Sequence, residues 1–411
     1  MRIVYLHQHF RAPSEAGGTR SYEFAKRLAD AGHDVQMVTA HHAPREHLSK
    51  SMWEHRDMDG FRVHYVQMPY SNRMSFSKRI ESFLKFAWRS AGKAAVLEGD
   101  VIFATSTPLT IALPAVYAKW KTKASIVFEV RDLWPELPIA LGALRSKPSQ
   151  MAARWLERFA YRHAEHIVAL SPGMADGVTA NRGARGKPVS VITNSSDIDL
   201  FQSAKPDRAL LQRRYGVPSD GPLMLYGGTL GLANDVTYLI EMMAELRKRV
   251  PAARLLIVGD GAEREKVEAA ATEKALLGNS VFMVTSAPKS DMPSILASAD
   301  VCFSVFANIP ALFHNSANKF FDALAAAKPV GINYPGWQAQ VLGETGAGFT
   351  MPPEEPVAAA GIVSEWLADA TRRAAAGQAA LALARERFSR DLHAQQLERI
   401  LREVADLSVS A

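Results

Sequence analysis

Residues 1–39 of the chain read MRIVYLHQHFRAPSEAGGTRSYEFAKRLADAGHDVQMVT. The apolar run at residues 3–6 predicts a strand, and the polar, Gly-containing stretch at residues 13–19 predicts the loop after it. Apolar residues recur at helical spacing through residues 22–31, and a Gly-His stop separates them from a second apolar run at residues 35–39. A strand, a helix and a strand in this order form a βαβ unit, from which parallel sheets are built.

The same alternation continues in two series along the chain. A parallel strand that is covered by helices on both faces is a continuous apolar run in the sequence. Such runs alternate with helical stretches in this chain. We therefore expect an α/β protein of two doubly wound, Rossmann-like domains that face each other across a cleft. The expected domains are residues 1–200, residues 201–385, and a helical tail at residues 386–411 that packs back toward the N-terminal domain. Strands are expected at residues 62–66, 101–104, 125–130, 167–170, 189–192, 223–226, 254–258, 281–284, 301–305 and 329–332, helices at residues 236–249 and 263–274, and a polar junction at residues 207–220.

The composition is that of an ordinary globular protein. The chain has 411 residues, of which 48% are hydrophobic and 22% charged, which excludes a collagen, a coiled coil and a disordered chain. Cys302 is the single cysteine, so a disulfide framework and a cysteine-based metal site are excluded. The first apolar run is too short for a signal peptide, and no later run reaches the roughly 18 residues of a membrane span. We expect a cytoplasmic protein.

Positive charge is concentrated in the first half of the sequence. Residues 1–200 contain 27 Lys and Arg against 19 Asp and Glu, whereas the remainder contains 21 against 23. Within residues 70–95 bases surround apolar residues at helical spacing, so a helix there either docks on the protein's own core or lies on anionic phospholipid. Nucleic acid is a third reading, but nothing else resembles a nucleic-acid module, and none is expected as a partner. The residues expected to contact an acceptor or a membrane are Arg79, Lys85, Trp88 and Arg89.

Three glycine-bearing turns each follow a predicted strand. They are Gly17-Gly18, Gly227-Gly-Thr-Leu-Gly231 and Val258-Gly-Asp-Gly261. Glycine lets the main chain approach an anion closely, although tight turns between a strand and a helix need glycine in any case. Together the turns favour a nucleotide more than any one does. The resulting candidate donor contacts are Gly17, Gly18, Gly228, Thr229, Gly259 and, at the end of a further strand, Val284.

A polar loop runs into a predicted helix in the stretch FHNSANKFFDALAAAKP, residues 313–329. Lys319 and Asp322 are three positions apart, so they lie on one face of its first turns, where free N–H groups attract anions. A lysine for a phosphate and a carboxylate for ribose hydroxyls would suit a sugar nucleotide. The alternative is a surface Lys–Asp pair worth only about a few tenths of a kcal/mol. The preceding residues that could contact the donor are His314, Asn315, Ser316, Ala317 and Asn318.

This stretch resembles the signature of the family 4 retaining glycosyltransferases, whose two-domain fold is called GT-B. In that family two glutamates stand eight positions apart before an Ala-rich run, and the matching positions here are His314 and Asp322. The resemblance implies that Asp322 holds ribose and that His314 replaces the glutamate that contacts the donor sugar. Residues 194–201 resemble the family's hinge segment, and residues 228–231 resemble its phosphate loop without the usual Arg and Lys. Pyrophosphate binding then falls to Lys319 and main-chain N–H groups.

A second resemblance lies at the end of a first-half strand, in FEVRDLWPELP at residues 128–138. With the His-Gln-His-Phe run at residues 7–10, it is similar to bacterial transferases of O-antigen and capsule assembly, particularly N-acetyl-L-fucosamine transferases. Arg131 could neutralise a departing diphosphate, and Asp132 could orient or deprotonate an acceptor hydroxyl. The alternative is a buried Arg–Asp pair that braces the strand end.

Two Asp-x-Asp motifs and a group of histidines could suggest a metal site, but their positions do not favour one. The Asp-x-Asp motifs at residues 57–59 and 197–199 fall in a turn and in the hinge segment. Histidines 7, 9, 41 and 42 gather at strand ends without a helical i, i+4 pair or an accompanying carboxylate motif. We expect no catalytic metal and no other cofactor.

These observations predict a retaining glycosyltransferase in which Asp132, Arg131 and Lys319 are catalytic. It would move a sugar, such as N-acetyl-L-fucosamine or another N-acetylated amino sugar, from a nucleotide-diphosphate donor, expected to be a UDP-sugar, to a lipid-linked saccharide acceptor. The donor would bind the second domain and the acceptor the first, with the protein peripheral on the inner face of the bacterial cytoplasmic membrane, in surface polysaccharide synthesis. A non-hydrolysing sugar-nucleotide 2-epimerase and a non-catalytic donor-binding subunit are the alternatives.

Overall fold

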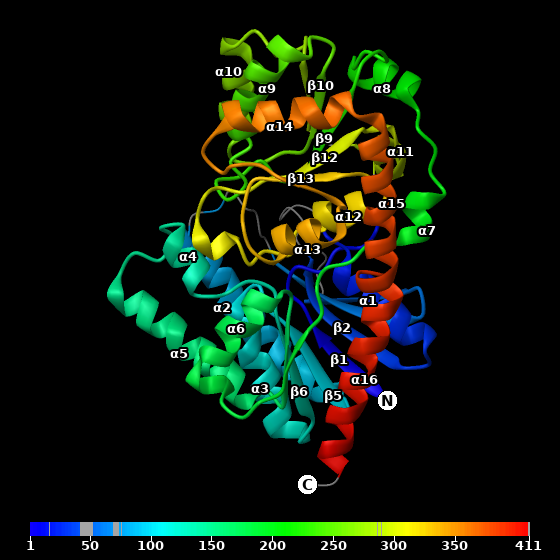
Figure 1. Ribbon diagram of the computed structural model, residues 1–411. Coiled ribbons are helices and arrows are strands. Elements are labelled where there is room, and N and C mark those ends of the chain that lie inside the picture. The colour runs from blue at the N-terminus through cyan, green and yellow to red at the C-terminus, as the bar shows by residue number, and fades with distance from the viewer. Residues whose placement is uncertain are drawn as a thin grey trace. The chain divides into compact units, whose positions relative to one another are not determined.

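Figure 1 shows a computed structural model of the chain. It describes residues 1–15, 17–41, 52–68, 74, 76–285, 287–288 and 290–409. His42 and residues 70–73 and 75, which belong to the predicted histidine and basic segments, lie outside these residues. The chain divides into two compact units, of which one is Met1–Thr193 with Arg390–Ala411 and the other is Asn194–Ser389.

The first unit contains an eight-stranded sheet within the described residues, in the order β3-β4-β2-β1-β5-β6-β7-β8. All neighbouring strands pair in parallel except the edge strand β3, which is antiparallel to β4. The sequence predicted a wholly parallel sheet and missed this strand. The residues of β3, WEHRDM, lie at the edge of the sheet, where a strand can be polar, so they form no apolar run that the sequence reasoning could detect. The strands are β1 (Arg2–Leu6), β2 (Asp34–His41), β3 (Trp53–Met58), β4 (Phe61–Gln67), β5 (Val101–Thr105), β6 (Ser125–Val130), β7 (His166–Ala169) and β8 (Val189–Val191).

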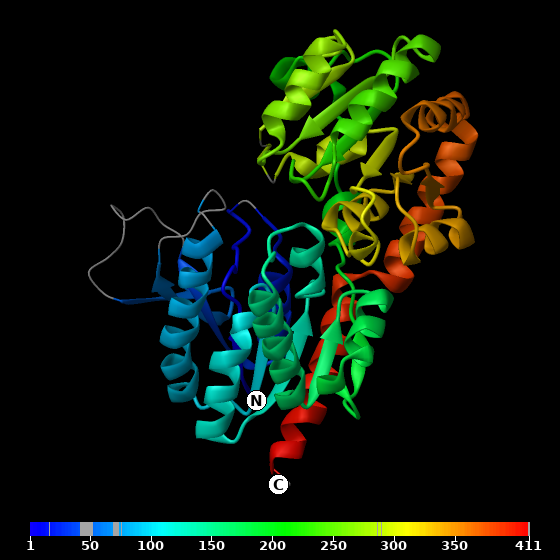
Figure 2. The same cartoon turned by 90° about the vertical axis from the view of Figure 1, so that its left-hand side faces the viewer.

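Helices cover both faces of this sheet. The apolar sides of α1 (Arg20–Asp30) and α16 (Arg390–Val409) pack in one core cluster, and those of α2 (Phe76–Val96), α3 (Ala112–Thr122) and α5 (Lys147–His163) pack in another. In Figure 2, α2 in blue and α3 in cyan lie side by side. The shorter elements of the unit are α4 (Glu136–Ala140), α6 (Pro172–Ala180) and the single turns η2 (Leu109–Ile111) and η3 (Arg182–Ala184).

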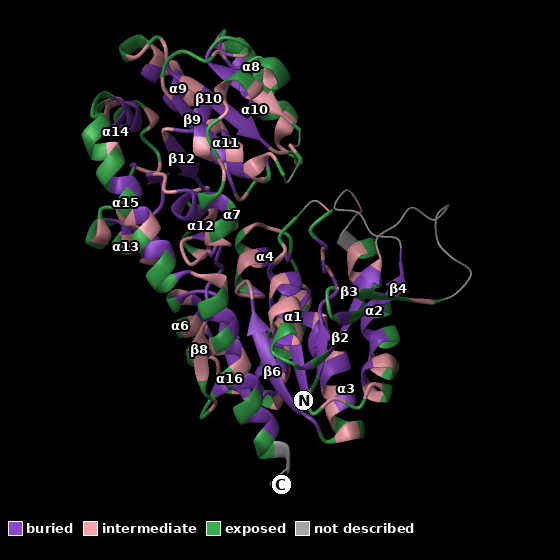
Figure 3. Cartoon of the chain, turned by 90° about the vertical axis from the view of Figure 1, so that its right-hand side faces the viewer, coloured by how far each residue is buried: buried purple, intermediate pink, exposed green. Residues whose placement is uncertain are grey.

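The second unit contains a six-stranded parallel sheet in its described residues, in the order β11-β10-β9-β12-β13-β14. Its strands are β9 (Leu223–Gly227), β10 (Arg254–Val258), β11 (Val281–Val284), β12 (Val301–Ser304), β13 (Val330–Ile332) and β14 (Gly348–Thr350). Its helices are α7 (Ile198–Gln202), α8 (Arg208–Tyr215), α9 (Thr237–Arg249), α10 (Arg264–Glu273), α11 (Met292–Ser298), α12 (Asn318–Ala325), α13 (Trp337–Thr345), α14 (Pro356–Ala368) and α15 (Ala370–Arg387), with the turn η4 (Pro310–Leu312). Figure 3 shows that buried residues concentrate on the strands and on the sides of the helices that face them. Two doubly wound α/β halves are thus confirmed.

The units divide at positions that differ from the sequence boundaries of 200 and 385. The first unit ends at Thr193, and the second ends at Ser389. The polar segment at residues 207–220, expected at the junction, forms α8 inside the second unit. The last helix, α16, belongs to the first unit, where its apolar residues Leu397, Leu401 and Val404 are buried with those of α1.

Arg20 and Glu129 form a buried ion pair in the first unit. Arg20 and Glu129 expose 4% and 0% of their side chains, and their Nη2 and Oε1 atoms are 2.8 Å apart. Arg20 also donates to the carbonyl oxygens of Thr193 at 2.6 Å and Ile192 at 2.9 Å, while the Thr105 hydroxyl donates to Glu129. The pair therefore ties the start of α1 to β6 and to the end of the unit's first segment.

We expect Arg20→Met to lower the free energy of unfolding by about 3–5 kcal/mol, because the variant leaves the Glu129 carboxylate and two carbonyls buried without their partner. Urea denaturation followed by circular dichroism measures the loss. Arg2→Met is the control, since the Arg2–Asp34 pair exposes 47% and 43% of its side chains and is worth at most about 1 kcal/mol. Equal losses in the two variants would contradict the assignment.

Candidate functional site

The glycine turns of the second unit meet at the carboxyl ends of β9, β10 and β11. The N–H of Gly228 donates to the Val258 carbonyl at 2.9 Å, and the N–H of Gly259 donates to the Val284 carbonyl at 2.8 Å. A Cβ atom at Gly259 would lie 1.8 Å from the Gly228 carbonyl oxygen. The structure therefore brings Gly228, Gly259 and Val284 together, and packing between two turns requires glycine at 259.

Lys319 lies in the first turn of α12, beside these turns. Its Nζ atom is 3.2 Å from the hydroxyl of Tyr226 and 4.8 Å from the ring centroids of Tyr226 and Phe306. A Cβ atom at Gly228 would lie 3.5 Å from the same Nζ. When the Asn234 amide nitrogen donates to the Thr229 carbonyl, its oxygen accepts from Lys319 at 3.0 Å. The predicted lysine and the predicted glycine loop thus form one site.

The groups that contact the Lys319 ammonium are neutral. They are a phenol hydroxyl, an amide oxygen and the faces of two aromatic rings. Desolvation of the ammonium lowers the pKa of Lys319 to about 7, because none of these neutral groups replaces the solvation that water gives a cation. A bound anion would restore the charged form, so this position is suited to a phosphate.

Asp322 lies one turn further along α12 and lines the same small cavity as Lys319, which measures about 30 Å³. Its Oδ1 atom accepts a hydrogen bond from the hydroxyl of Ser196. The predicted placement of Lys319 and Asp322 on one helical face agrees with this shared lining. The hydrogen bond ties the carboxylate to the segment just before α7.

The loop before α12 uses its polar side chains to hold its own shape. The Asn315 amide donates to the Leu312 carbonyl at 2.8 Å, and the Asn315 carbonyl accepts from the Trp337 indole at 3.0 Å. The Ser316 hydroxyl accepts from the main-chain N–H of Asn194 at 2.9 Å. Asn315 and Ser316 therefore position the start of α12.

The remaining predicted donor residues flank that start. Ala317 is the N-cap residue of α12, and Asn318 is its first residue, so their main-chain N–H groups lie at the helix N-terminus. His314 is partly buried just after η4. Thr229 is exposed, and its carbonyl accepts from the Tyr226 hydroxyl at 2.8 Å.

Two side chains at this edge were missed by the sequence reasoning. Tyr226 contacts Lys319, and Arg264, at the start of α10, donates to the Gly259 carbonyl at 3.0 Å. Asn234, which also contacts Lys319, lies near the position where the family resemblance expects a base of the phosphate loop. Arg264 places a second cation at the glycine turns. Its only sequence signal is its position three residues after Gly261, at a predicted helix start.

Arg131 and Asp132 lie at the carboxyl end of β6 in the first unit. The Arg131 N–H donates to the Ser106 hydroxyl at 2.9 Å, and its Nη1 atom is 3.3 Å from Nε2 of His7. Asp132 accepts from the Thr107 hydroxyl at 3.2 Å. Arg131 thus contacts His7, and Asp132 contacts Thr107.

The surroundings of Asp132 change the pKa of its carboxyl. Desolvation raises the pKa of its carboxyl, and the positive charge of Arg131 offsets part of this effect. A carboxyl with a raised pKa is a candidate for general acid–base chemistry.

Gly17 and Gly18 are exposed in the loop before α1 of the first unit. Gly17 has φ +124°, and a Cβ atom there would lie 3.3 Å from the Cγ of Arg11. The turn itself therefore requires glycine at position 17. These two glycines belong to the same unit as Arg131, whereas the turns around Lys319 belong to the other.

The basic helix α2 docks on its own core and still leaves a tryptophan outside. Phe83 and Phe86 are buried, whereas Trp88 is 85% exposed. Lys85 pairs with Glu81 on the helix surface, and Arg89 donates to the Gln67 carbonyl at 3.1 Å. Arg79 is partly exposed on the same helix.

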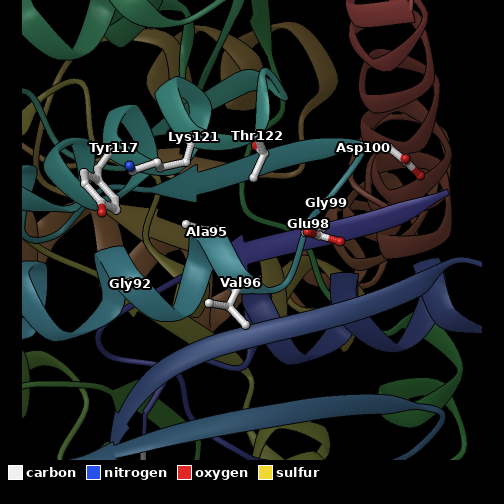
Figure 4. A pocket seen from close by; sticks show the side chains of 9 residues that line it. All are labelled: Gly92, Ala95, Val96, Glu98, Gly99, Asp100, Tyr117, Lys121 and Thr122. Atoms are coloured by element: carbon white, nitrogen blue, oxygen red, sulfur yellow. The ribbon is translucent and has the colours of Figure 1, made fainter.

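Figure 4 shows a groove of about 740 Å³ in the first unit. It lies at the ends of α2 and α3 and beside the start of β5, at the edge of the sheet opposite the carboxyl ends of the strands. Its lining comes from Gly92, Ala95, Val96, Glu98, Gly99, Asp100, Tyr117, Lys121 and Thr122. In the described part of the chain, no three His, Cys, Asp or Glu side chains are grouped as a metal site. None of the described helices has the length and hydrophobicity needed to cross a membrane.

Two family descriptions match the chain in sequence. "Glycosyl transferase 4-like domain" matches residues 16–195, and "Glycosyl transferases group 1" matches residues 207–382. The first therefore matches most of the first unit's N-terminal segment, and the second matches most of the second unit.

The chain also resembles individual proteins of known activity, at low sequence identity. The 2-deoxystreptamine glucosyltransferase of Streptomyces kanamyceticus is 25% identical over 215 residues, which are 52% of this chain and 54% of that protein. The GDP-mannose-dependent alpha-(1-6)-phosphatidylinositol monomannoside mannosyltransferase of Mycolicibacterium smegmatis is 28% identical over 187 residues, which are 44% of this chain and 48% of that protein. The chain thus matches about half the length of these relatives.

The fold is shared with a solved structure along almost the whole chain. Anabaena Alr3699/HepE, solved in complex with UDP and glucose, superposes with a TM-score of 0.71 at 20% identity, covering 98% of this chain and 100% of that one. At this identity the likeness establishes the fold, which is the predicted GT-B arrangement of two Rossmann-like halves.

We expect Gly259→Ala to destabilise the second unit by about 1–3 kcal/mol, because the new methyl group would overlap the Gly228 carbonyl. Thermal unfolding measures the effect. Gly343→Ala in α13 is the control, since a Cβ atom there meets nothing within 4 Å and alanine favours a helix. An unchanged melting temperature of Gly259→Ala would show that the two turns separate easily.

Proposed function

Because the chain belongs to the family 4 glycosyltransferases with the GT-B fold, we propose that it transfers a sugar from a nucleotide diphosphate to an acceptor hydroxyl. The observation that carries the proposal is the Lys319 ammonium, whose contacts beside the Gly228 turn are all with neutral groups among the residues that the structure describes. Departure of a nucleotide diphosphate builds negative charge on its outer phosphate. A cation that lacks a carboxylate partner in its contact shell is positioned to receive that charge.

We propose a UDP-sugar as donor. Lys319, main-chain N–H groups at the start of α12 and Arg264 would contact the diphosphate, and Asp322 would contact ribose. His314 would contact the sugar where the family uses glutamate. The solved complex of Alr3699/HepE with UDP and glucose supports this choice of nucleotide, whereas the mycobacterial relative is named as GDP-mannose-dependent.

For the chemical step we propose transfer with retention, as the family resemblance implies. The acceptor oxygen attacks the anomeric carbon on the face from which the diphosphate leaves, the bond from that carbon to the diphosphate oxygen breaks, and the acceptor proton is released. Asp132 would orient the hydroxyl or take its proton, and Arg131 with the N–H groups of Gly17 and Gly18 would stabilise the diphosphate. No catalytic metal is expected, and turnover that persists in excess EDTA would agree with this.

For the acceptor we propose a lipid-linked saccharide at the inner face of the cytoplasmic membrane, in surface polysaccharide synthesis. The basic helix α2 with exposed Trp88 supports it, as does the phospholipid-derived acceptor in the name of the mycobacterial relative. An aminocyclitol acceptor is the second candidate, because another relative is named as a 2-deoxystreptamine glucosyltransferase. An N-acetylated amino sugar such as N-acetyl-L-fucosamine is the proposed group transferred.

A panel assay separates these possibilities. The protein is incubated with UDP- and GDP-sugars and with either a polyprenyl-diphosphate-linked saccharide or 2-deoxystreptamine, and the products are identified by mass spectrometry. Transfer to the lipid-linked saccharide alone is the expected result. Conversion of the donor without acceptor would indicate an epimerase, and donor binding without any product would indicate a binding subunit.

Lys319 gives the proposal a pH signature. The pKa of Lys319 is about 7 in the protein without ligand, and a bound diphosphate raises it. UDP affinity should therefore be constant just below pH 7 and fall by up to about tenfold per pH unit above pH 7. Binding above pH 7 should also take up close to one proton. Isothermal titration calorimetry in two buffers of different ionisation enthalpy measures both quantities.

The Lys319→Met variant should bind UDP more weakly and lose this pH dependence between pH 7 and 9. Lys266→Met is a matched control in the same unit, because Lys266 is 60% exposed and pairs with Glu263. If Lys319→Met kept the wild-type affinity and pH profile, Lys319 would not contact the diphosphate.

A further inference from the structure

The outward faces of α2, α3 and α5 expose an unusual share of large hydrophobic side chains. Thirteen such side chains are exposed among the described residues, and seven of them lie on these three helices. They include Trp88 at 85%, Trp120 at 64% and Trp155 at 61% exposure, one from each helix. Met151 and Val96 add flexible and branched apolar groups at 71% and 78%.

The same helices carry a large excess of positive charge. Their sequences contain eleven Lys or Arg and two Asp or Glu, an excess larger than the net charge of +6 of the whole chain. The helices on the opposite face of the sheet, α1 and α16, contain six bases and six acids. The excess of positive charge in the helices of the first unit is therefore confined to one face of its sheet.

Aromatic and cationic groups are also paired locally on this face. The Lys121 Nζ atom lies 4.6 Å from the ring centroid of Trp120 and 5.9 Å from that of Tyr117. Val96, Tyr117 and Lys121 also line the groove of Figure 4, which borders the face. Tryptophan side chains with adjacent lysines are the combination that settles at the boundary between lipid headgroups and acyl chains.

We propose that α2, α3 and α5 together form the surface by which the first unit docks on an anionic phospholipid bilayer, with Trp88, Trp120 and Trp155 in the headgroup layer. This surface, the three-helix face, deepens the proposed function, since it rests on an acceptor that is held in a membrane. Charge selects the bilayer as its occupant, because a second copy of this chain would place the same excess of cations against itself. The sequence reasoning had assigned this role to α2 alone.

Vesicle co-sedimentation tests the proposal without any assay of transfer. The full chain is mixed with vesicles of phosphatidylcholine alone or of equal parts phosphatidylcholine and phosphatidylglycerol, at low and at high salt. Wild-type protein should sediment with the anionic vesicles, and the bound fraction should fall with salt. Trp120→Ser with Trp155→Ser, and separately Lys121→Glu with Lys147→Glu, should each weaken the apparent affinity about tenfold or more.

Two controls keep the outcome clear. The substituted side chains are exposed, so both double variants should keep the wild-type melting temperature and the wild-type rate on a detergent-solubilised acceptor. Leu392→Ser with Arg399→Glu makes the same types of change on the opposite face and should leave vesicle binding unchanged.

Several results would overturn the three-helix face. They are wild-type binding by both double variants, equal affinity for neutral and anionic vesicles, or a homodimer in solution that the Trp120 and Trp155 substitutions dissociate. Failure of the proposed function would look different, since vesicle binding would persist while no glycosyl product formed on any acceptor.

Discussion

The candidate site of the second unit depends on the contact between the turns after β9 and β10. Only a hydrogen atom fits at Gly259 against the Gly228 carbonyl, where a Cβ atom would lie at 1.8 Å. Their main-chain N–H groups donate to Val258 and Val284, so the sheet's hydrogen bonding continues past the strand ends. The two turns thus pack closely, and the Lys319 ammonium lies against the Gly228 turn. If the turns were further apart, Lys319 and the Gly228 turn would not contact each other.

Arg20 and Lys319 illustrate two ways in which this protein withdraws a cation from water. Arg20 binds a carboxylate and two carbonyl oxygens, so its hydrogen-bonding capacity is directed at partners that belong to the fold. Lys319 contacts neutral groups, which do not replace the solvation that water gives its ammonium, and the pKa of Lys319 is lowered as a result. A cation whose partners belong to the fold is already satisfied by them, whereas a cation that contacts only neutral groups among the described residues can bind an anionic ligand. This contrast distinguishes a structural role for Arg20 from the ligand-binding role proposed for Lys319.

The two faces of the first sheet are covered by layers of different character. The layer of α1 and α16 is balanced in charge, and it contains the segment that returns from the far end of the chain. The layer of α2, α3 and α5 combines a large excess of cations with exposed aromatic rings. Both layers bury apolar residues equally well on the inside, so core packing does not account for the difference. It is the outer surfaces that differ, and the proposed docking on lipid explains that difference.

The sequence determined the features that depend on neighbours along the chain. Continuous apolar runs located the strands that are buried on both faces, and the spacing of three between Lys319 and Asp322 placed them on one side of a helix. The same reasoning could not find β3, whose polar residues lie at an exposed edge, or β14, whose residues Gly-Phe-Thr form no continuous apolar run.

Only the tertiary structure decided which groups surround each candidate. Tyr226 reaches Lys319 across 93 positions, His7 reaches Arg131 across 124, and Trp88, Trp120 and Trp155 share a face because their helices cover the same side of one sheet. Periodicity reports which way a residue faces within its own element. The order of strands in a sheet sets which elements become neighbours, and that order depends on how all the apolar faces are buried together.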